Sequence, residues 1–154
     1  MIKKWGDYLA LDLLDQQTVQ VVDGSDLTWQ DAIRQAAKPL VDNGTAGEDY
    51  VDAMIDVVED KGPYINIGPN IALAHSRPRP SVKKVGLALM KTNQPVNLVS
   101  DEHPVKLWFV LAATDSNSHL KVIQELSTVL MDADRTKQLL AATSVDDVLD
   151  ILKD

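Results

Sequence analysis

Apolar residues recur at helical spacing in the first third of the chain. This spacing predicts a helix over residues 26–44, DLTWQDAIRQAAKPLVDNG, where Thr28 and Asp31 resemble a capping box. Pro39 predicts a kink or an early end of that helix, because proline cannot donate a backbone hydrogen bond. Residues 47–63, GEDYVDAMIDVVEDKGP, predict a second helix that stops at its final Gly-Pro pair.

The middle of the chain carries short apolar runs that are typical of buried strands. The C-terminal third returns to helical spacing, with Leu120 on the apolar face of its first helix and a second capping-box pattern at Ser144 and Asp147. Helices on both sides of a strand-rich centre indicate an α/β or mixed α+β class with one sheet. The predicted strands are TVQVV (18–22), YINI (64–67), IALAH (71–75), KKVGLALMK (83–91) and PVKLWFVLAAT (104–114), and the helices cover 116–132, 132–142 and 144–154.

Length and composition narrow the class of protein. The 154 residues are enough for one domain with a core, and the lack of cysteine excludes disulfides, thiolate catalysis and cysteine metal sites. No apolar run approaches the length of a membrane span, and Asp7 and Asp12 interrupt any signal-peptide core, so a cytoplasmic location is the default expectation. The net charge of −8 argues against nucleic acid as a partner.

The charge is unevenly distributed. Residues 62–100 hold five Lys or Arg and no Asp or Glu, so the remainder carries −13, which is −8 less the +5 of this window. Most of these cations follow His75 in NIALAHSRPRPSVKKVG, residues 70–86. Such a basic segment in an acidic protein indicates a local task with a small anion. The alternative is a solvated basic loop beside a strand.

Histidine is the candidate chemical group. His75 ends a predicted strand and His119 begins a predicted helix after a polar loop, so both would face one cavity if their strands are neighbours. Neutral imidazole is nucleophilic and can accept a phosphoryl group. His103 lies in an acidic turn and is interpreted as a surface residue. Two alternatives remain. One is a zinc site of three histidines, although the histidines are not at the usual ligand spacing, and the other is Ser-His-Asp hydrolysis, although no nucleophile elbow surrounds a serine.

Longer segments resemble a known family. GPYINIGPNIALAHSRP is similar to the active-site segment of enzyme IIA components of the bacterial sugar phosphotransferase system, in the fructose–mannitol superfamily. PVKLWFVLAATDSNSHLKVIQELSTVLMD and LLAATSVDDVLDILK resemble the family's downstream segments, so the similarity runs from about Trp29 to Lys153. WQDAIRQAAKPLVDNG and YVDAMIDVVEDKGPYI look most like the ascorbate-type branch.

The resemblance implies a function and a set of site residues. It implies one enzyme IIA domain over residues 1–154, with a single central mixed sheet flanked by helices on both faces. It implies that His75 accepts a phosphoryl group from the carrier protein HPr and passes it to a cysteine of enzyme IIB, for the permease enzyme IIC. His119 would be the second histidine, and Arg77 would bind phosphate or anchor the loop. No metal and no organic cofactor is implied.

The sequence departs from the family pattern beside the histidine. Ala74 stands where the family has proline, Ser76 where it has alanine, and Arg79 where an acidic residue often ends the motif. These departures keep the nucleophile but change the charge of the loop. Ascorbate as the sugar rests on the branch resemblance alone, and a homodimer is one alternative for the oligomeric state. A phosphorylation-dependent regulatory module of the same fold, without its own sugar, is the second functional hypothesis.

Overall fold

The computed structural model describes residues 9–153, and it contains one five-stranded sheet in the order β1-β4-β5-β3-β2. The N-terminal segment with Asp7, on which the predicted absence of a signal peptide partly depends, lies outside these residues. No helix within residues 9–153 is long and apolar enough to cross a membrane. The elements are η2 (Leu9–Leu13), β1 (Val19–Val22), α1 (Trp29–Asp42), α2 (Glu48–Lys61), β2 (Asn66–Gly68), β3 (Asn70–Ala74), β4 (Gly86–Asn97), β5 (Pro104–Ala112), α3 (Ser116–Leu130), α4 (Ala133–Ala141) and α5 (Val145–Lys153).

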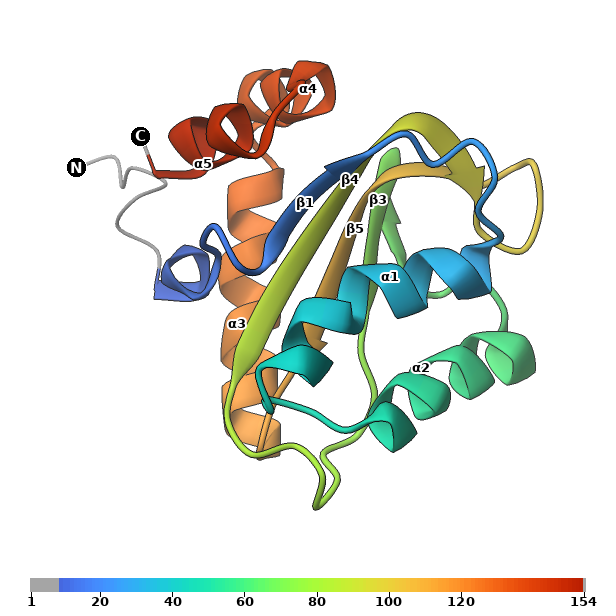
Figure 1. The fold of residues 1–154 in the computed structure, drawn as a ribbon, viewed down its shortest axis with the longest axis vertical. Helices are drawn as coiled ribbons and strands as arrows, with labels where there is room; N and C mark the ends of the chain where they lie inside the picture. The colour runs from blue at the N-terminus through green and yellow to red at the C-terminus, as the bar shows by residue number, and fades with distance from the viewer. Residues whose placement is uncertain (1–8, 154) are drawn as a thin grey trace.

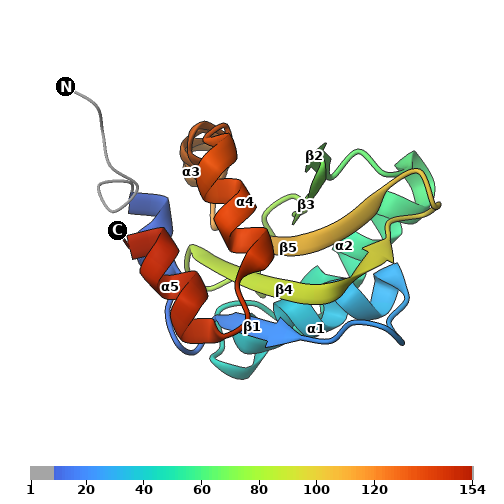
Figure 2. The same ribbon diagram turned by 90° about the horizontal axis from the view of Figure 1, so that it is seen from above.

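The sheet is mixed, as the α/β prediction requires. β3 runs parallel to β5 and β1 parallel to β4, whereas β4–β5 and β2–β3 are antiparallel pairs. The helices cover both faces of the sheet (Figures 1 and 2): α1 and α2 lie on one face, and η2, α3, α4 and α5 lie on the other. The predicted architecture of one mixed sheet between two helical layers is therefore confirmed.

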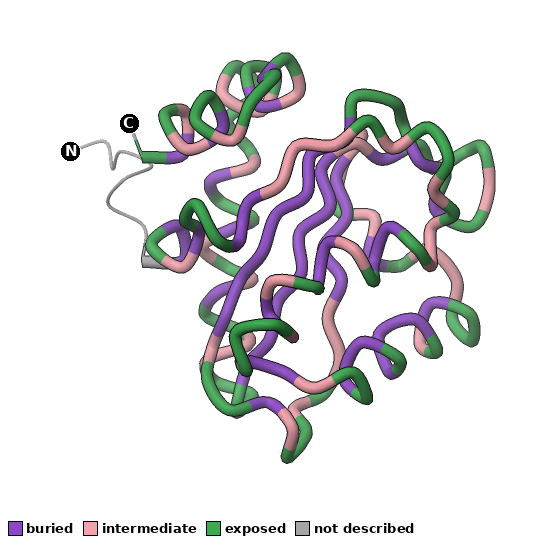
Figure 3. The backbone as a smooth tube through the Cα atoms, viewed as in Figure 1, coloured by how far each residue is buried: buried purple, intermediate pink, exposed green. Residues whose placement is uncertain are grey.

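The core has two layers because successive residues of a strand point to opposite faces. In β5, Trp108 and Val110 join the cluster under α1 and α2, whereas Phe109 and Leu111 join the cluster under α3 and α5. β5 is buried along almost its whole length, as is the first half of β4 (Figure 3). This is why their sequences form continuous apolar runs and not an alternating pattern.

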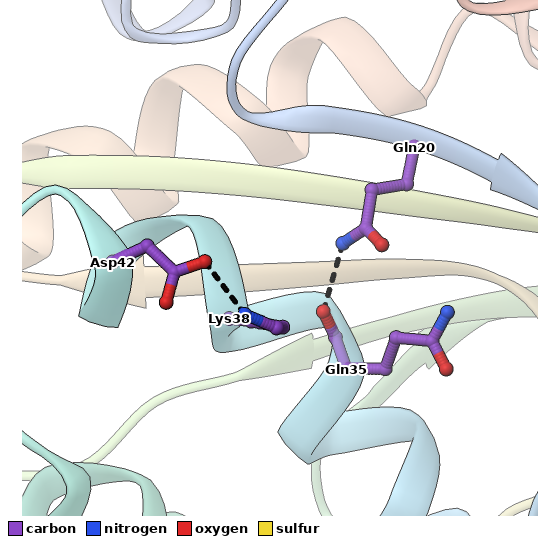
Figure 4. A network of polar contacts seen from close by, with 4 residues as sticks. All are labelled: Gln20, Gln35, Lys38 and Asp42. Atoms are coloured by element: carbon purple, nitrogen blue, oxygen red, sulfur yellow. Dashed lines mark hydrogen bonds and ion pairs between the residues drawn. The ribbon is translucent and has the colours of Figure 1, made fainter.

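Pro39 does not bring α1 to an early end, which was one of the two effects expected of it, since the helix continues to Asp42. A proline at this position leaves the carbonyl of Gln35, four residues earlier, without its helical donor. The side chain of Gln20 on β1 supplies the missing bond, with Nε2 donating to the Gln35 carbonyl at 2.8 Å (Figure 4). The Lys38–Asp42 ion pair at 2.7 Å lies in the turn that contains the proline.

Other local predictions hold with small corrections. The Thr28–Asp31 capping box is complete, whereas only the Ser144 half of the second one forms, since the Asp147 carboxylate accepts from Thr143 instead. Leu120 was predicted on the buried face of its helix but is 55% exposed.

Candidate functional site

His75 and His119 lie together at one end of the sheet. β3 and β5 are parallel neighbours with Ala74 opposite Val110, so both chains leave the sheet at the same edge. His75 is the first residue after β3, and His119 lies in the first turn of α3, which follows β5. The centroids of the two imidazole rings are 5.0 Å apart, with the rings inclined at 54°. The strands that lead to the two histidines are thus neighbours, which is the condition set from the sequence for both imidazoles to face one cavity.

The backbone fixes the tautomer of His75. Its Nδ1 lies 3.0 Å from the carbonyl oxygen of Leu73, two residues earlier. A carbonyl only accepts hydrogen bonds, so Nδ1 carries the proton and donates it. In the neutral ring, Nε2 then keeps a lone pair. The half-buried His75 therefore presents Nε2 as the nucleophilic atom.

The ring of Tyr64 also contacts the His75 ring. The two rings meet edge to face with centroids 5.7 Å apart. The phenol hydroxyl lies 3.5 Å from the backbone carbonyl of His75, at the limit of a hydrogen bond. Partial burial raises the pKa of Tyr64, so the phenol stays neutral at physiological pH. The His75 ring thus contacts the rings of both Tyr64 and His119.

His119 is positioned by a capped helix start. The Asp115 carboxylate accepts a hydrogen bond from the backbone N–H of Ser118 at 2.8 Å, and that bond lowers the pKa of Asp115. The pKa of His119 is also lowered, first by burial and then by the nearby His75. Its Nε2 is buried and has no hydrogen-bond partner among residues 9–153. His119 is therefore a neutral imidazole whose buried Nε2 makes no hydrogen bond within this part of the chain.

Tyr50 links the two chain segments that carry the histidines. Its side chain comes from α2, is 1% exposed, and places the hydroxyl 2.6 Å from the Leu111 carbonyl and 3.1 Å from the Ser76 backbone nitrogen. Burial raises the pKa of Tyr50 to about 12. In the sequence, Tyr50 is one residue of the helix predicted over residues 47–63. Helical spacing predicts that such a side chain is buried but says nothing of what its hydroxyl meets.

The basic residues after His75 lie in a loop, and not on a strand. β4 begins at Gly86, so the expectation of a strand through Lys83 and Lys84 is wrong at its start. The Lys83 ammonium donates to the Pro80 carbonyl at 2.9 Å. Arg79 lies 4.0 Å from Asp49 of α2 in an exposed pair. Arg77 is exposed and makes no hydrogen bond or ion pair within the part of the chain that the structure describes.

His103 does not join this site. It is half-buried, and its Nδ1 lies 3.0 Å from the side-chain oxygen of Asn66, at the opposite end of β3 from His75. The expectation of a plain surface histidine is therefore corrected to a residue that links the turn before β5 to the start of β2. Within residues 9–153, no three histidine or carboxylate side chains are grouped so that they could hold a metal ion.

Comparison with known proteins places these features in a family. Residues 12–154 match the sequence model of the phosphoenolpyruvate-dependent sugar phosphotransferase system EIIA 2 family. A mannitol-specific cryptic phosphotransferase enzyme IIA component of Escherichia coli K12 is 32% identical over 141 residues, which is 92% of this chain and 95% of that protein. An ascorbate-specific EIIA component of Shigella flexneri is 34% identical over 127 residues, covering 81% of this chain and 82% of the relative.

Solved structures share the fold. The solution structure of the mannitol-specific cryptic enzyme IIA from Escherichia coli superposes with a TM-score of 0.84 at 32% identity, covering 94% of this chain and 97% of that one. Enzyme IIA of mannitol, solved in complex with phosphorylated enzyme IIB from Escherichia coli, gives a TM-score of 0.76 at 29% identity, with coverage of 90% and 96%.

Proposed function

Because the chain belongs to the EIIA 2 family of the sugar phosphotransferase system, and is therefore a phosphotransferase component, we propose that it carries the phosphoryl group on Nε2 of His75. The observation that carries the proposal is the hydrogen bond from Nδ1 to the Leu73 carbonyl, which leaves Nε2 as the free nucleophile beside a second imidazole. We also propose that residues 1–154 form one EIIA domain, since the family match spans 12–154 and helices cover both faces of the sheet.

The reaction consists of two transfers. In the first, the Nε2 lone pair attacks phosphorus on phosphorylated HPr, and the bond between phosphorus and HPr breaks as the new P–N bond forms. In the second, a cysteine thiolate of enzyme IIB attacks the same phosphorus, and the electron pair of the P–N bond returns to Nε2. Throughout both steps the Nδ1 proton stays on its hydrogen bond to Leu73. No proton has to be removed from His75, so positioning and charge stabilisation are the main demands on the protein.

We propose that three groups stabilise the transferred phosphoryl group. When neutral His119 carries its proton on Nε2, this nitrogen can donate a hydrogen bond to the phosphoryl group. Nε2 has no other hydrogen-bond partner among the described residues. The N-terminus of α3, where His119 lies, favours negative charge through the helix dipole. Arg77 is exposed in the loop just after His75, and we propose that it approaches the phosphate when a partner is bound.

The partners follow from the same site. A complex of a solved relative with phosphorylated enzyme IIB supports enzyme IIB as the acceptor, and HPr and the permease enzyme IIC complete the proposed chain of transfer. Two apolar side chains beside the histidines are exposed, Tyr64 by 43% and Leu120 by 55%. Exposed apolar groups around a reactive centre are typical of a protein-binding surface. We propose that these two residues contact HPr and enzyme IIB.

We propose L-ascorbate as the transported sugar. The ascorbate-specific relative supports this proposal at 34% identity. The mannitol-specific relative, which is 32% identical over a longer span, makes mannitol the competing candidate. Both names specify one substrate of the phosphotransferase system, which favours transport over the regulatory alternative. Reconstitution with the cognate enzymes IIB and IIC should phosphorylate ascorbate and not mannitol. Phosphorylation of neither sugar would favour the regulatory alternative.

The test of the site is phosphorylation of the purified protein. Incubation with phosphoenolpyruvate and the general phosphotransferase proteins should add one acid-labile, base-stable phosphoryl group. His75→Ala should lose it completely, and His103→Ala is the matched control, because it removes a histidine from outside the site and should leave phosphorylation intact. Phosphate that persists on the His75→Ala protein would refute the assignment.

A further inference from the structure

The hydroxyl of Tyr50 is inserted between two backbone groups at the end of the sheet. It lies 2.6 Å from the carbonyl oxygen of Leu111 and 3.1 Å from the backbone nitrogen of Ser76. Leu111 is on β5, which leads to His119, and Ser76 directly follows His75. The carbonyl can only accept, so the hydroxyl donates its one proton to Leu111 and its oxygen accepts from the Ser76 N–H. The hydroxyl therefore both donates and accepts a hydrogen bond.

The register of the sheet shows what this hydroxyl replaces. The backbone N–H of Leu73 points away from β5, since it donates to Ile65 at 2.9 Å. N–H groups alternate along a strand, so those of residues 72, 74 and 76 are directed toward β5. With Ala74 opposite Val110, a parallel ladder that continued for two more residues would join the Ser76 N–H directly to the Leu111 carbonyl. The Tyr50 hydroxyl occupies the place of that hydrogen bond.

We propose that Tyr50 is a positioning residue for phosphoryl transfer, whose hydroxyl keeps the ends of β3 and β5 apart so that the imidazoles of His75 and His119 meet in reactive geometry. A direct N–H···O bond would bring the two backbone groups to about 2.9 Å, whereas a bridging hydroxyl separates them by up to about twice that distance. The side chain reaches the gap from α2, on the face opposite α3, and so does not compete with His119 for space.

The burial of Tyr50 supports a permanent role. Because burial raises its pKa to about 12, the hydroxyl remains a donor at every pH at which the protein works. The ring itself packs in the core beneath the sheet, and phenylalanine would keep that packing. Tyr50→Phe therefore isolates the contribution of the bridge from the contribution of the aromatic ring.

The inference rests on the proposed role of His75, and one experiment separates the two. Tyr50→Phe should slow phosphorylation by phosphorylated HPr by about 10- to 100-fold, since misplacing reacting groups by about 1 Å has an effect of that size. The matched control is Thr92→Val, which removes another buried neutral hydroxyl, 2.6 Å from the Gln94 carbonyl. Thr92 lies six residues along β4 from the site end of the strand, about 20 Å away, and its loss should leave the rate unchanged.

A spectroscopic readout distinguishes positioning from general destabilisation. In Tyr50→Phe, the ¹⁵N shift of the Ser76 amide and those of the His75 and His119 ring nitrogens should change, whereas in Thr92→Val they should match the wild type. If wild type is phosphorylated on His75 and both variants react at the wild-type rate, the positioning role is overturned while the proposed function stands. If wild type is not phosphorylated on His75, the proposed function fails first.

A measurement on the unmodified protein keeps the test valid if Tyr50→Phe does not fold. The Tyr50 hydroxyl proton should exchange slowly enough with water to be seen by NMR, with nuclear Overhauser contacts to the Ser76 amide. A hydroxyl proton in fast exchange with water would overturn the bridge.

Discussion

Replacing His119 tests how the second imidazole contributes to transfer. His119→Ala removes an imidazole whose ring centroid lies 5.0 Å from that of His75 and whose buried Nε2 has no hydrogen-bond partner among residues 9–153. Losing one preorganised donor to the developing charge typically lowers a rate by 10²- to 10³-fold, or about 3–4 kcal/mol of transition-state stabilisation. We expect a loss at the lower end of this range, because the N-terminus of α3 remains in place.

The effect on folding should be much smaller than the effect on the rate. The side chain is half-buried, makes no hydrogen bond through Nε2 within the described residues, and has a lowered pKa. Its removal therefore breaks no strong interaction that the structure contains. His119→Gln adds a matched control, since it returns an amide donor of similar reach and should recover part of the lost rate.

The assay is rapid-quench transfer of labelled phosphate from HPr to each variant, together with urea unfolding of the same samples. The free energy of unfolding should decrease only slightly from wild type to His119→Ala to His119→Gln. The rate of phosphoryl transfer should be lowest for His119→Ala. A His119→Ala protein that is phosphorylated within twofold of the wild-type rate would refute the reasoning. One that does not fold would identify His119 as a structural residue of the core instead.

The remaining predictions concern stability. The pKa of His119 is lowered below its ordinary 6.5 in the folded protein, so below pH 6.5 the unfolded chain binds more protons than the folded one. The free energy of unfolding measured with urea should therefore decrease as the pH falls below 6.5. His119→Gln should reduce this pH dependence. Gln20→Ala should lower the free energy of unfolding by about 1–3 kcal/mol, because the Gln35 carbonyl loses its donor. In a Pro39→Ala background, which restores a helical N–H, the same change should cost clearly less; equal costs would contradict the compensation.

The elements were predictable because their signals are local. Apolar spacing predicted α1, α2 and the two long strands, β4 and β5. The Thr28–Asp31 pair predicted the N-terminal cap of α1. Pro39 was misleading because its compensation comes from Gln20, on a different element 19 residues earlier. The prediction for Leu120 was wrong because helical spacing identifies an apolar side chain but does not show whether that side chain is buried. Leu120 lies next to His119 and is exposed.

The site was predictable in its parts but not in its assembly. His75 stood out by its place at a strand end, and His119 by its place at a helix start. That the two rings meet depends on the pairing of β3 with β5, which joins segments more than 30 residues apart and has no local signal. Tyr50 and Tyr64 were missed for the same reason, since their roles arise only when α2 and the start of β2 are packed against the end of β3.

The most direct test of the central claim is to locate the phosphoryl group. After reaction with phosphoenolpyruvate and the general phosphotransferase proteins, ³¹P and long-range ¹H–¹⁵N NMR of the phosphorylated protein should show phosphorus bonded to Nε2 of His75, with Nδ1 still protonated. A phosphoryl group on Nδ1 of His75, or on His119, His103 or any other residue, would contradict the account.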